Sequence, residues 1–257
     1  MTETHGIIYV FFESFGSYLV FFKNIIIWTF RKPFDLKNIM QQMLEIGYKS
    51  LPVTGITLFF TGMVMALQIG RAMDALMPGS SIYIGSAVTI SMFRELSPVL
   101  TALLLAGRVG SAIAAQIGTM KVTEQIDALV TLSANPIQYL AVPRFLACLV
   151  MTPVLTVITD VVGVLGGAFI AYFGLGVTID KYLENIFQYI TLMDFVSGIM
   201  KSVFFGIEIS VIACYQGFAT MGGAEGVGRT TISAVVKSSM AVLISDYFLT
   251  YLLAFMG

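Results

Sequence analysis

Six charged residues interrupt the long apolar stretches of this sequence, and they hold most of its chemical possibilities. They are Arg94, Glu95, Asp160, Lys201, Glu208 and Asp246. A charge at the centre of a membrane-spanning helix costs about 2.5–3.5 kcal/mol on insertion, so it is retained where it pairs with another group or is used. Such groups can pair across helices, line a polar cavity, contact a lipid headgroup or carry protons.

The spacing of these charges indicates which of them face the same way. Arg94 and Glu95 are neighbours, whereas Asp194, Lys201 and Glu208 follow one another at intervals of seven residues. Adjacent side chains on a helix diverge by about 100°, so we expect at least one of the first two to face a cavity. The seven-residue interval places the other three on one helix face. For the later charges we favour pairing between helices, and for the adjacent pair a functional contact.

The residue types that catalysis or metal binding would need are scarce. The sequence has one histidine, His5, and two cysteines, Cys148 and Cys214, which lie in apolar stretches. We interpret the cysteines as small buried hydrophobic residues. We therefore predict that the chain is not an enzyme and carries no metal and no cofactor.

One segment partly matches the sequence pattern of a nucleotide-binding loop. Residues 223–230 read GAEGVGRT, close to the phosphate-loop pattern G-x-x-x-x-G-K-[ST], but Arg229 stands where the lysine belongs and no strand precedes the segment. We expect a flexible turn with a basic end. If ATP drives this protein, another chain must supply the ATPase.

The elements that position these residues follow from composition. The 257-residue chain is 57% hydrophobic and 11% charged, against about 25% charged residues in soluble domains. Its net charge of −1 gives no basic field for nucleic acid. These values predict an all-α integral membrane protein. Residues 50–257 form its membrane domain, with spans at about 50–70, 82–118, 145–173, 195–219 and 238–256.

Residues 1–49 hold an aromatic-rich segment, 6–30, that either lies in the membrane interface or forms a sixth span. We favour an interfacial helix because basic residues flank it. Nine lysines and arginines fall in residues 31–49, 108–144 and 217–237 and a tenth, Lys23, precedes them, against Arg71 and Lys181 in the other connections. The positive-inside rule places the basic segments and the N-terminus on the cytoplasmic side, and the C-terminus outside.

Small residues recur at every fourth position in the second and third spans. They are Ala102, Ala106, Gly110, Ala114 and Gly118, followed later by Gly163, Gly167 and Ala171. Such rows let helices approach closely. They serve packing within the chain, a homodimer interface or a cavity wall.

Residues 120–132, MKVTEQIDALVTL, are typical of a short amphipathic helix between two spans. Asn135-Pro136 follows, and the residue before a proline disfavours helix. This helix either lies on the membrane surface or docks a cytoplasmic partner.

Three segments of the sequence read RELSPVLTALLLAGRVGSAIAAQIGTMKVTEQIDAL, NPIQYLAVPR and GAEGVGRTT. Together they resemble the MlaE (YrbE-type) permease family, the membrane subunits of Mce-associated ABC transporters of lipids. The resemblance runs from about Lys49 to the end of the chain. It implies a homodimer in the bacterial inner membrane, with partner ATPase subunits that bind ATP and Mg, a STAS-domain protein and a periplasmic ring of Mce-domain subunits. The transported substrate would be phospholipid or a related lipid.

The resemblance also assigns roles to residues. It implies that residues 120–132 form a coupling helix, with ATPase contacts at Lys121, Glu124, Gln125 and Asp127. It implies that Arg94 and Glu95 lie beside a lipid cavity, with Arg94 near a headgroup phosphate or paired with a neighbouring group. The cavity would also be lined by Met63, Met65, Leu67 and Gln68. The N-terminal segment would be the family's interfacial helix.

Two other classes of protein stay open from the residues alone. One is a proton-coupled secondary transporter that uses Asp160, Glu208 or Asp246 as proton carriers. The other is a membrane scaffold that moves nothing. Co-purification of an ATPase subunit would favour the ABC transporter over both.

Overall fold

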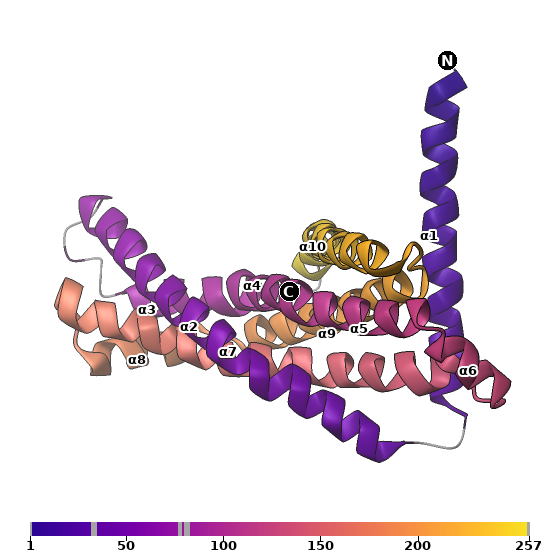
Figure 1. The fold of residues 1–257 in the computed structure, drawn as a ribbon. Coiled ribbons are helices and arrows are strands. Elements are labelled where there is room, and N and C mark those ends of the chain that lie inside the picture. Colours follow the sequence, from indigo (N-terminus) through magenta and orange to yellow (C-terminus); the bar gives the residue numbers. More distant parts are fainter. Residues whose placement is uncertain (1, 32–34, 77–78, 80–82, 256–257) are drawn as a thin grey trace.

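The computed structural model describes residues 2–31, 35–76, 79 and 83–255, and every regular element in these ranges is helical. Figure 1 shows the arrangement. The elements are α1 (Thr2–Thr29), α2 (Leu36–Leu76), α3 (Ile84–Ser91), η2 (Met92–Leu96), α4 (Ser97–Leu105), η3 (Ala106–Gly110), α5 (Ser111–Val122), α6 (Gln125–Thr131), η4 (Ile137–Ala141), α7 (Val142–Leu175), α8 (Ile179–Tyr189), α9 (Leu192–Phe218) and α10 (Gly223–Ala254). The three η elements are π-helical turns.

Five helical segments in the described ranges are long and apolar enough to cross a membrane. They are Leu36–Leu76, Ile84–Val122, Ile137–Leu175, Leu192–Phe218 and Gly223–Leu253. The prediction of an all-α membrane protein with five spans and an additional N-terminal helix is therefore confirmed. The second span is built from five consecutive elements, α3 to α5, with η2 and η3 between the α segments.

The helices extend beyond the apolar windows from which we predicted the spans. The first begins at Leu36 rather than near residue 50, and the last begins at Gly223 rather than near residue 238. Residues 223–230, expected to be a flexible turn, are the first two turns of α10. Hydropathy marks only the part of a helix that suits lipid, so polar turns at either end escape it. Residues 82 and 256, expected as span ends, lie outside the described residues.

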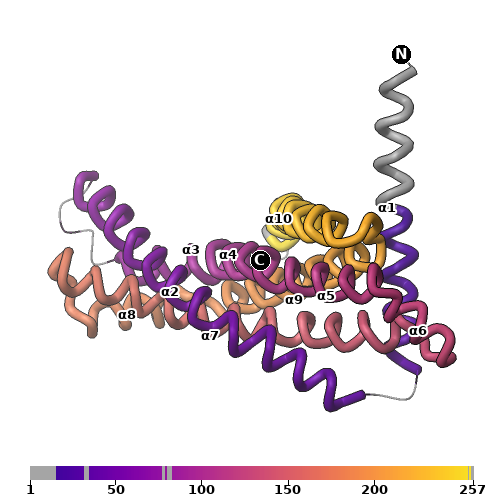
Figure 2. The backbone as a smooth tube through the Cα atoms, in the orientation of Figure 1, coloured from indigo at the N-terminus to yellow at the C-terminus, as the bar shows by residue number. Residues whose placement is uncertain are grey.

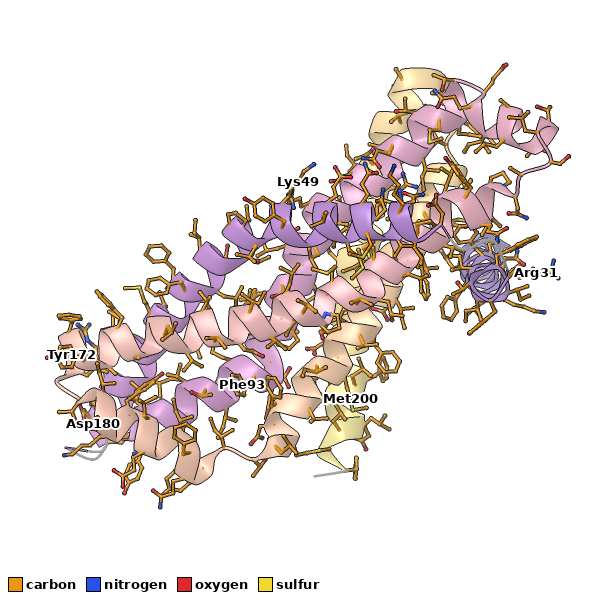
Figure 3. All side chains as sticks on the ribbon, turned by 90° about the horizontal axis from the view of Figure 1, so that it is seen from below. Arg31, Lys49, Phe93, Tyr172, Asp180 and Met200 are labelled. Atoms are coloured by element: carbon orange, nitrogen blue, oxygen red, sulfur yellow. The ribbon has the colours of Figure 1, made fainter. Side chains whose placement is uncertain are left out.

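The bundle has two ends with different elements. We call them the α6 end, where α1 and α6 lie, and the α8 end, where α8 joins α7 to α9 (Figure 1). In Figure 3, Tyr172 and Asp180 mark the α8 end and Arg31 the α6 end. The α8 helix was not predicted. Its Tyr182 is buried against α3 and α7, and its hydroxyl donates to the Val164 carbonyl at 3.2 Å. Burial raises the pKa of Tyr182 to about 12, so this hydroxyl stays protonated.

The N-terminal helix α1 lies across the bundle rather than along it, as Figure 1 shows. Phe21 contacts the rings of Tyr215 and Phe218, with centroids 5.7 Å away in both cases, and Gln216 donates to the Tyr18 hydroxyl. These contacts hold α1 against the end of α9. A helix perpendicular to the spans has the direction that an interfacial helix takes.

The first and third spans cross at glycines. Figure 2 shows α2 running obliquely over α7. A Cβ atom on Gly62 would overlap the carbonyl of Gly163, and one on Gly166 would overlap the carbonyl of Phe59. The two backbones therefore touch directly at this crossing, which only residues without side chains allow.

The longer row of small residues packs against α9 of the same chain. Ala102, Ala106 and Ala114 are fully buried, and a Cβ on Gly217 of α9 would meet Ile117 and the Ala114 carbonyl. Of the roles considered for this row, packing within the chain is the one seen. Cys148 and Cys214 are also buried in this core.

The α2–α7 crossing yields a stability prediction. Gly62→Ala should lower the free energy of unfolding by about 1–3 kcal/mol, because the added methyl group must push the Gly163 backbone away. The measurement is the melting temperature of the detergent-purified protein. Gly55→Ala is the matched control on the same helix, because its added Cβ would meet no other described residue within 4 Å beyond the adjacent backbone of α2. Equal melting temperatures for the two variants would show that the crossing tolerates a side chain.

Candidate functional site

The second span changes its winding where its two adjacent charges lie. Arg94 and Glu95 belong to η2, a π-helical turn, and such single turns inside α-helices are frequent at functional sites. Pro98 follows four residues after Arg94 and has no N–H to donate to the Arg94 carbonyl. The side chain of Lys201 donates to that carbonyl instead, at 3.0 Å. The proline thus creates an acceptor inside the bundle, and α9 supplies the donor.

Close approach of α9 to η2 makes this contact possible. A Cβ on Gly198 would overlap the Phe93 carbonyl, so the α9 backbone lies directly against η2 at this point. In Figure 3, Phe93 lies in the half of the bundle toward Tyr172 and Asp180, which places η2 nearer the α8 end.

Arg94 pairs with a carboxylate at the beginning of α9. Its Nε lies 3.0 Å from Oδ1 of Asp194. The other oxygen of Asp194 accepts hydrogen bonds from the Thr191 backbone N–H at 2.9 Å and the Thr191 hydroxyl at 2.7 Å. This capping arrangement holds Asp194 in place at the helix start. Arg94 is therefore anchored through one nitrogen to a rigid partner.

Lys201 is the buried centre of the charged network, with 2% of its side chain exposed. It donates to the Arg94 carbonyl, to Oε2 of Glu95 at 2.7 Å and to the Thr250 hydroxyl at 2.6 Å. A lysine has three N–H donors, so these bonds use all of them. Oδ1 of Asp246 lies 3.0 Å from the same ammonium group and balances its charge without a hydrogen bond.

A cavity of about 320 Å³ lies beside this network. Its lining residues come from the second, fourth and fifth spans: Ile90, Ser91, Arg94, Glu95, Ser197, Lys201, Thr250 and Leu253. The side chains of Arg94 and Glu95 are 45% and 43% exposed, although each has an ionic partner. The adjacent pair can therefore contact a molecule in the cavity while remaining bound to α9.

The other intramembrane carboxylates lie apart from this cavity. Oε2 of Glu208 accepts a hydrogen bond from the Ser245 hydroxyl at 2.9 Å. Asp160 of α7 is 1% exposed, and its Oδ1 has no hydrogen-bond partner among the described residues. The structure thus joins Lys201 and Asp246 to Arg94 and Glu95, and it separates Glu208 and Asp160 from them. Within the described part of the chain, no cluster of three or more acidic, cysteine or histidine side chains could hold a metal ion.

The residues expected to line the cavity from the first span lie elsewhere in the single chain. Met63, Met65 and Leu67 of α2 are half-buried and Gln68 is exposed, and α2 is not among the elements that line the 320 Å³ cavity. Their role in a lipid cavity stays a prediction. Two participants were not singled out by sequence reasoning, namely Asp194 as the Arg94 partner and Thr250. The sequence signals that could have pointed to this network are the seven-residue interval between Asp194 and Lys201 and the presence of Pro98 four residues after Arg94.

Residues 120–132 do not form the single helix that we expected. The second span continues to Val122, and α6 begins only at Gln125. Glu124 between them has φ 61°, the left-handed conformation that few residues other than glycine adopt. Lys121 and Asp127 bridge the turn at 3.1 Å. The four candidate contact residues therefore surround a sharp turn at the α6 end, and Glu124, Gln125 and Asp127 are exposed.

Comparison with known proteins identifies first the class of this membrane protein. The chain is 46% identical over 243 residues to a probable ABC transporter permease protein of Rickettsia typhi, covering 95% of this chain and 93% of the relative. It is 43% identical over 217 residues to a probable ABC transporter permease protein of Synechocystis, covering 84% and 82%. The chain is thus a permease of the ABC transporter type.

The family follows from a narrower match. The family model described as Permease MlaE matches residues 39–252, so this chain belongs to the MlaE permease family. Protein TRIGALACTOSYLDIACYLGLYCEROL 1 of Arabidopsis thaliana chloroplasts is also similar, at 41% identity over 214 residues, which cover 83% of this chain and 61% of that protein.

The Lys201 network yields a second stability prediction. Lys201→Met should lower the free energy of unfolding by about 3–5 kcal/mol, because it leaves the Glu95 and Asp246 carboxylates without their shared cation. Thermal unfolding of the purified protein measures the loss. Combining the change with Glu95→Gln and Asp246→Asn removes the stranded charges and should recover part of it. Lys237→Met, at an exposed lysine of α10, is the control. If Lys201→Met unfolds at the same temperature as this control, the network does not stabilise the bundle.

Proposed function

We propose that this chain is the permease subunit of an ATP-driven transporter that moves phospholipid or a related lipid between the bacterial inner membrane and the cell envelope. The observation that carries the proposal is the cavity in which Arg94 and Glu95 stay partly exposed at membrane depth. A lipid headgroup has the charges that such a pair can bind, and its acyl chains suit the apolar surroundings. The name of the Arabidopsis relative contains that of a glycerolipid, which supports a lipid substrate.

The proposed assembly follows the family resemblance. Two copies of the chain enclose the lipid site, and cytoplasmic ATPase subunits with bound ATP and Mg contact the α6 end, with a STAS-domain protein. The α8 end faces the periplasm and meets a ring of Mce-domain subunits. The excess of basic residues toward the α6 end supports this orientation, with the N-terminus on the cytoplasmic side and the C-terminus on the periplasmic side.

One continuous span connects the two candidate sites. Arg94 and Glu95 lie in η2, and the same span ends at the turn that holds Glu124. ATPase closure that pushes on this turn displaces the span along its length. The π turns η2 and η3 are the points where its winding can adjust. Residues of η2 and of α9 both line the cavity, and Lys201 and Asp194 join the two elements. Displacement at η2 therefore changes the shape of the cavity.

A second candidate function is proton-coupled transport without an ATPase. Asp160 favours it, because a buried intramembrane carboxylate with an oxygen that has no hydrogen-bond partner in the described part of the chain resembles a proton carrier. Transport that persists without ATP and stops when a proton gradient is collapsed would support this alternative. Transport that requires a co-purifying ATPase would exclude it.

The headgroup role of Arg94 has a direct test. Arg94→Ala should lower the phospholipid that co-purifies with the complex by about tenfold, because a charge-assisted contact to phosphate is lost. Lipid extraction and mass spectrometry of the purified complex measure it. Arg71→Ala is the matched control, because Arg71 is exposed on α2 and does not line the cavity. Equal lipid content in the two variants would rule out this role.

The energy input has a test at the opposite end. Replacing Glu124 and Asp127 with lysine should weaken ATPase association by about tenfold or more, because two exposed carboxylates at the turn become cations. Pull-down and stimulated ATP hydrolysis measure it. Loss of the Lys121–Asp127 bridge should change the free energy of unfolding only slightly, since exposed ion pairs are worth about 0–1 kcal/mol. The same replacement at Asp180 and Glu184, exposed on α8, is the control. Unchanged association in the first variant would remove the turn from the ATPase interface.

A further inference from the structure

The cavity presents two opposite charges from adjacent residues of one turn. Arg94 and Glu95 both line it, and nearly half of each side chain is exposed. Their Cα atoms are about 3.8 Å apart, as in any two consecutive residues. A ligand that contacts both side chains therefore needs an anionic and a cationic group close together.

Each of the two side chains keeps unused bonding capacity. Arg94 has one ion pair in the described part of the chain, through Nε, so its two terminal nitrogens remain for an anion. A guanidinium binds phosphate through such nitrogens in a bidentate manner. Glu95 accepts from Lys201 and Thr250. A carboxylate offers about four acceptor positions, so it can accept further hydrogen bonds from an ammonium group.

The charge of the whole network disfavours an anionic ligand. Two cations, Arg94 and Lys201, are bound to three carboxylates, Glu95, Asp194 and Asp246, which gives a net charge of −1. A headgroup with a phosphate alone adds a second negative charge in a medium of low dielectric constant, where repulsion is strong. A headgroup that also carries an ammonium adds none.

We propose that this site selects a zwitterionic phospholipid headgroup with a primary ammonium, as in phosphatidylethanolamine. The phosphate binds the free nitrogens of Arg94, and the ammonium donates to Glu95. A quaternary ammonium, as in phosphatidylcholine, has no N–H to donate. Among the described residues that line the cavity there is also no aromatic ring that could bind it through cation–π contact. This inference rests on the proposed function, since it names the lipid class for the same cavity.

The test is a lipid-competition measurement on the complete transporter complex. The complex is incorporated into nanodiscs with equal parts of phosphatidylethanolamine, phosphatidylcholine and phosphatidylglycerol that carry identical acyl chains. Lipid retained after re-purification in detergent is quantified by mass spectrometry. We expect about tenfold enrichment of phosphatidylethanolamine over each of the others, the ratio that about 1.4 kcal/mol produces. Equal retention of all three lipids would overturn the inference and leave the proposed function intact. Retention of no lipid would instead count against the proposed function.

Two variants distinguish a direct contact between Glu95 and the headgroup ammonium from an effect of the net charge of the network. Glu95→Gln and Asp246→Asn each remove one negative charge from the network, but only Glu95 lines the cavity. Glu95→Gln should abolish the preference for phosphatidylethanolamine over phosphatidylcholine, because both headgroups are neutral and differ in what they donate to the carboxylate. Asp246→Asn should keep that preference. A preference that survives in the Glu95 variant would contradict the assigned contact.

A final arm distinguishes a lipid from a free headgroup compound. Water-soluble glycerophosphoethanolamine carries the same phosphate and ammonium without acyl chains. It should not displace retained phosphatidylethanolamine at concentrations tenfold above the lipid, because the acyl chains contribute most of the binding energy. Displacement by this compound would show that the site binds a soluble zwitterion and would overturn the assignment to lipid.

Discussion

The buried ammonium of Lys201 is the interaction on which the arrangement of the spans depends. Its three hydrogen bonds and its ionic contact join the second, fourth and fifth spans at one point. A lysine at membrane depth is costly unless its charge and donors are satisfied, so this point fixes the three helices relative to one another. Because Glu95 is one of the acceptors, the same lysine also positions the rim of the cavity. Stability of the bundle and geometry of the site are therefore not separable here.

The first and third spans are joined by a different physical principle. At the Gly62–Gly163 crossing the backbones touch, and the contact is one of van der Waals packing without charge. Lipid offers no hydrophobic gain for bringing helices together, so close packing must supply the attraction. The permease thus combines two kinds of contact between spans. Polar contacts of Lys201 join the second, fourth and fifth spans, whereas close backbone packing joins the first and third. The Lys201 contacts border the cavity, whereas neither α2 nor α7 is among the elements that line it.

Much of this architecture could be predicted from the sequence, and its failures have identifiable causes. Apolar windows predicted five spans. They also drew attention to Arg94, Glu95 and Lys201, because charged residues are rare within apolar segments. The same windows missed the polar turns of α2 and α10 and the short helix α8. These parts are not apolar enough to be detected as membrane-spanning segments. The split after Val122 was missed because Glu124 adopts a left-handed conformation without a glycine to signal it. The pairing of Arg94 with Asp194 needed knowledge of which helices are neighbours, and spacing within one helix cannot supply that.

The position of the Lys201 partners along the chain has a consequence for biogenesis. Thr250 and Asp246 belong to the last helix, so they leave the ribosome after every other part of this joint has been made. Until then the nascent chain holds a lysine in its fourth hydrophobic segment with only part of its final set of acceptors. The last helix therefore supplies the contacts that complete the surroundings of Lys201. A truncated translation product would retain an incompletely satisfied intramembrane cation, which is the kind of defect that membrane quality control can recognise.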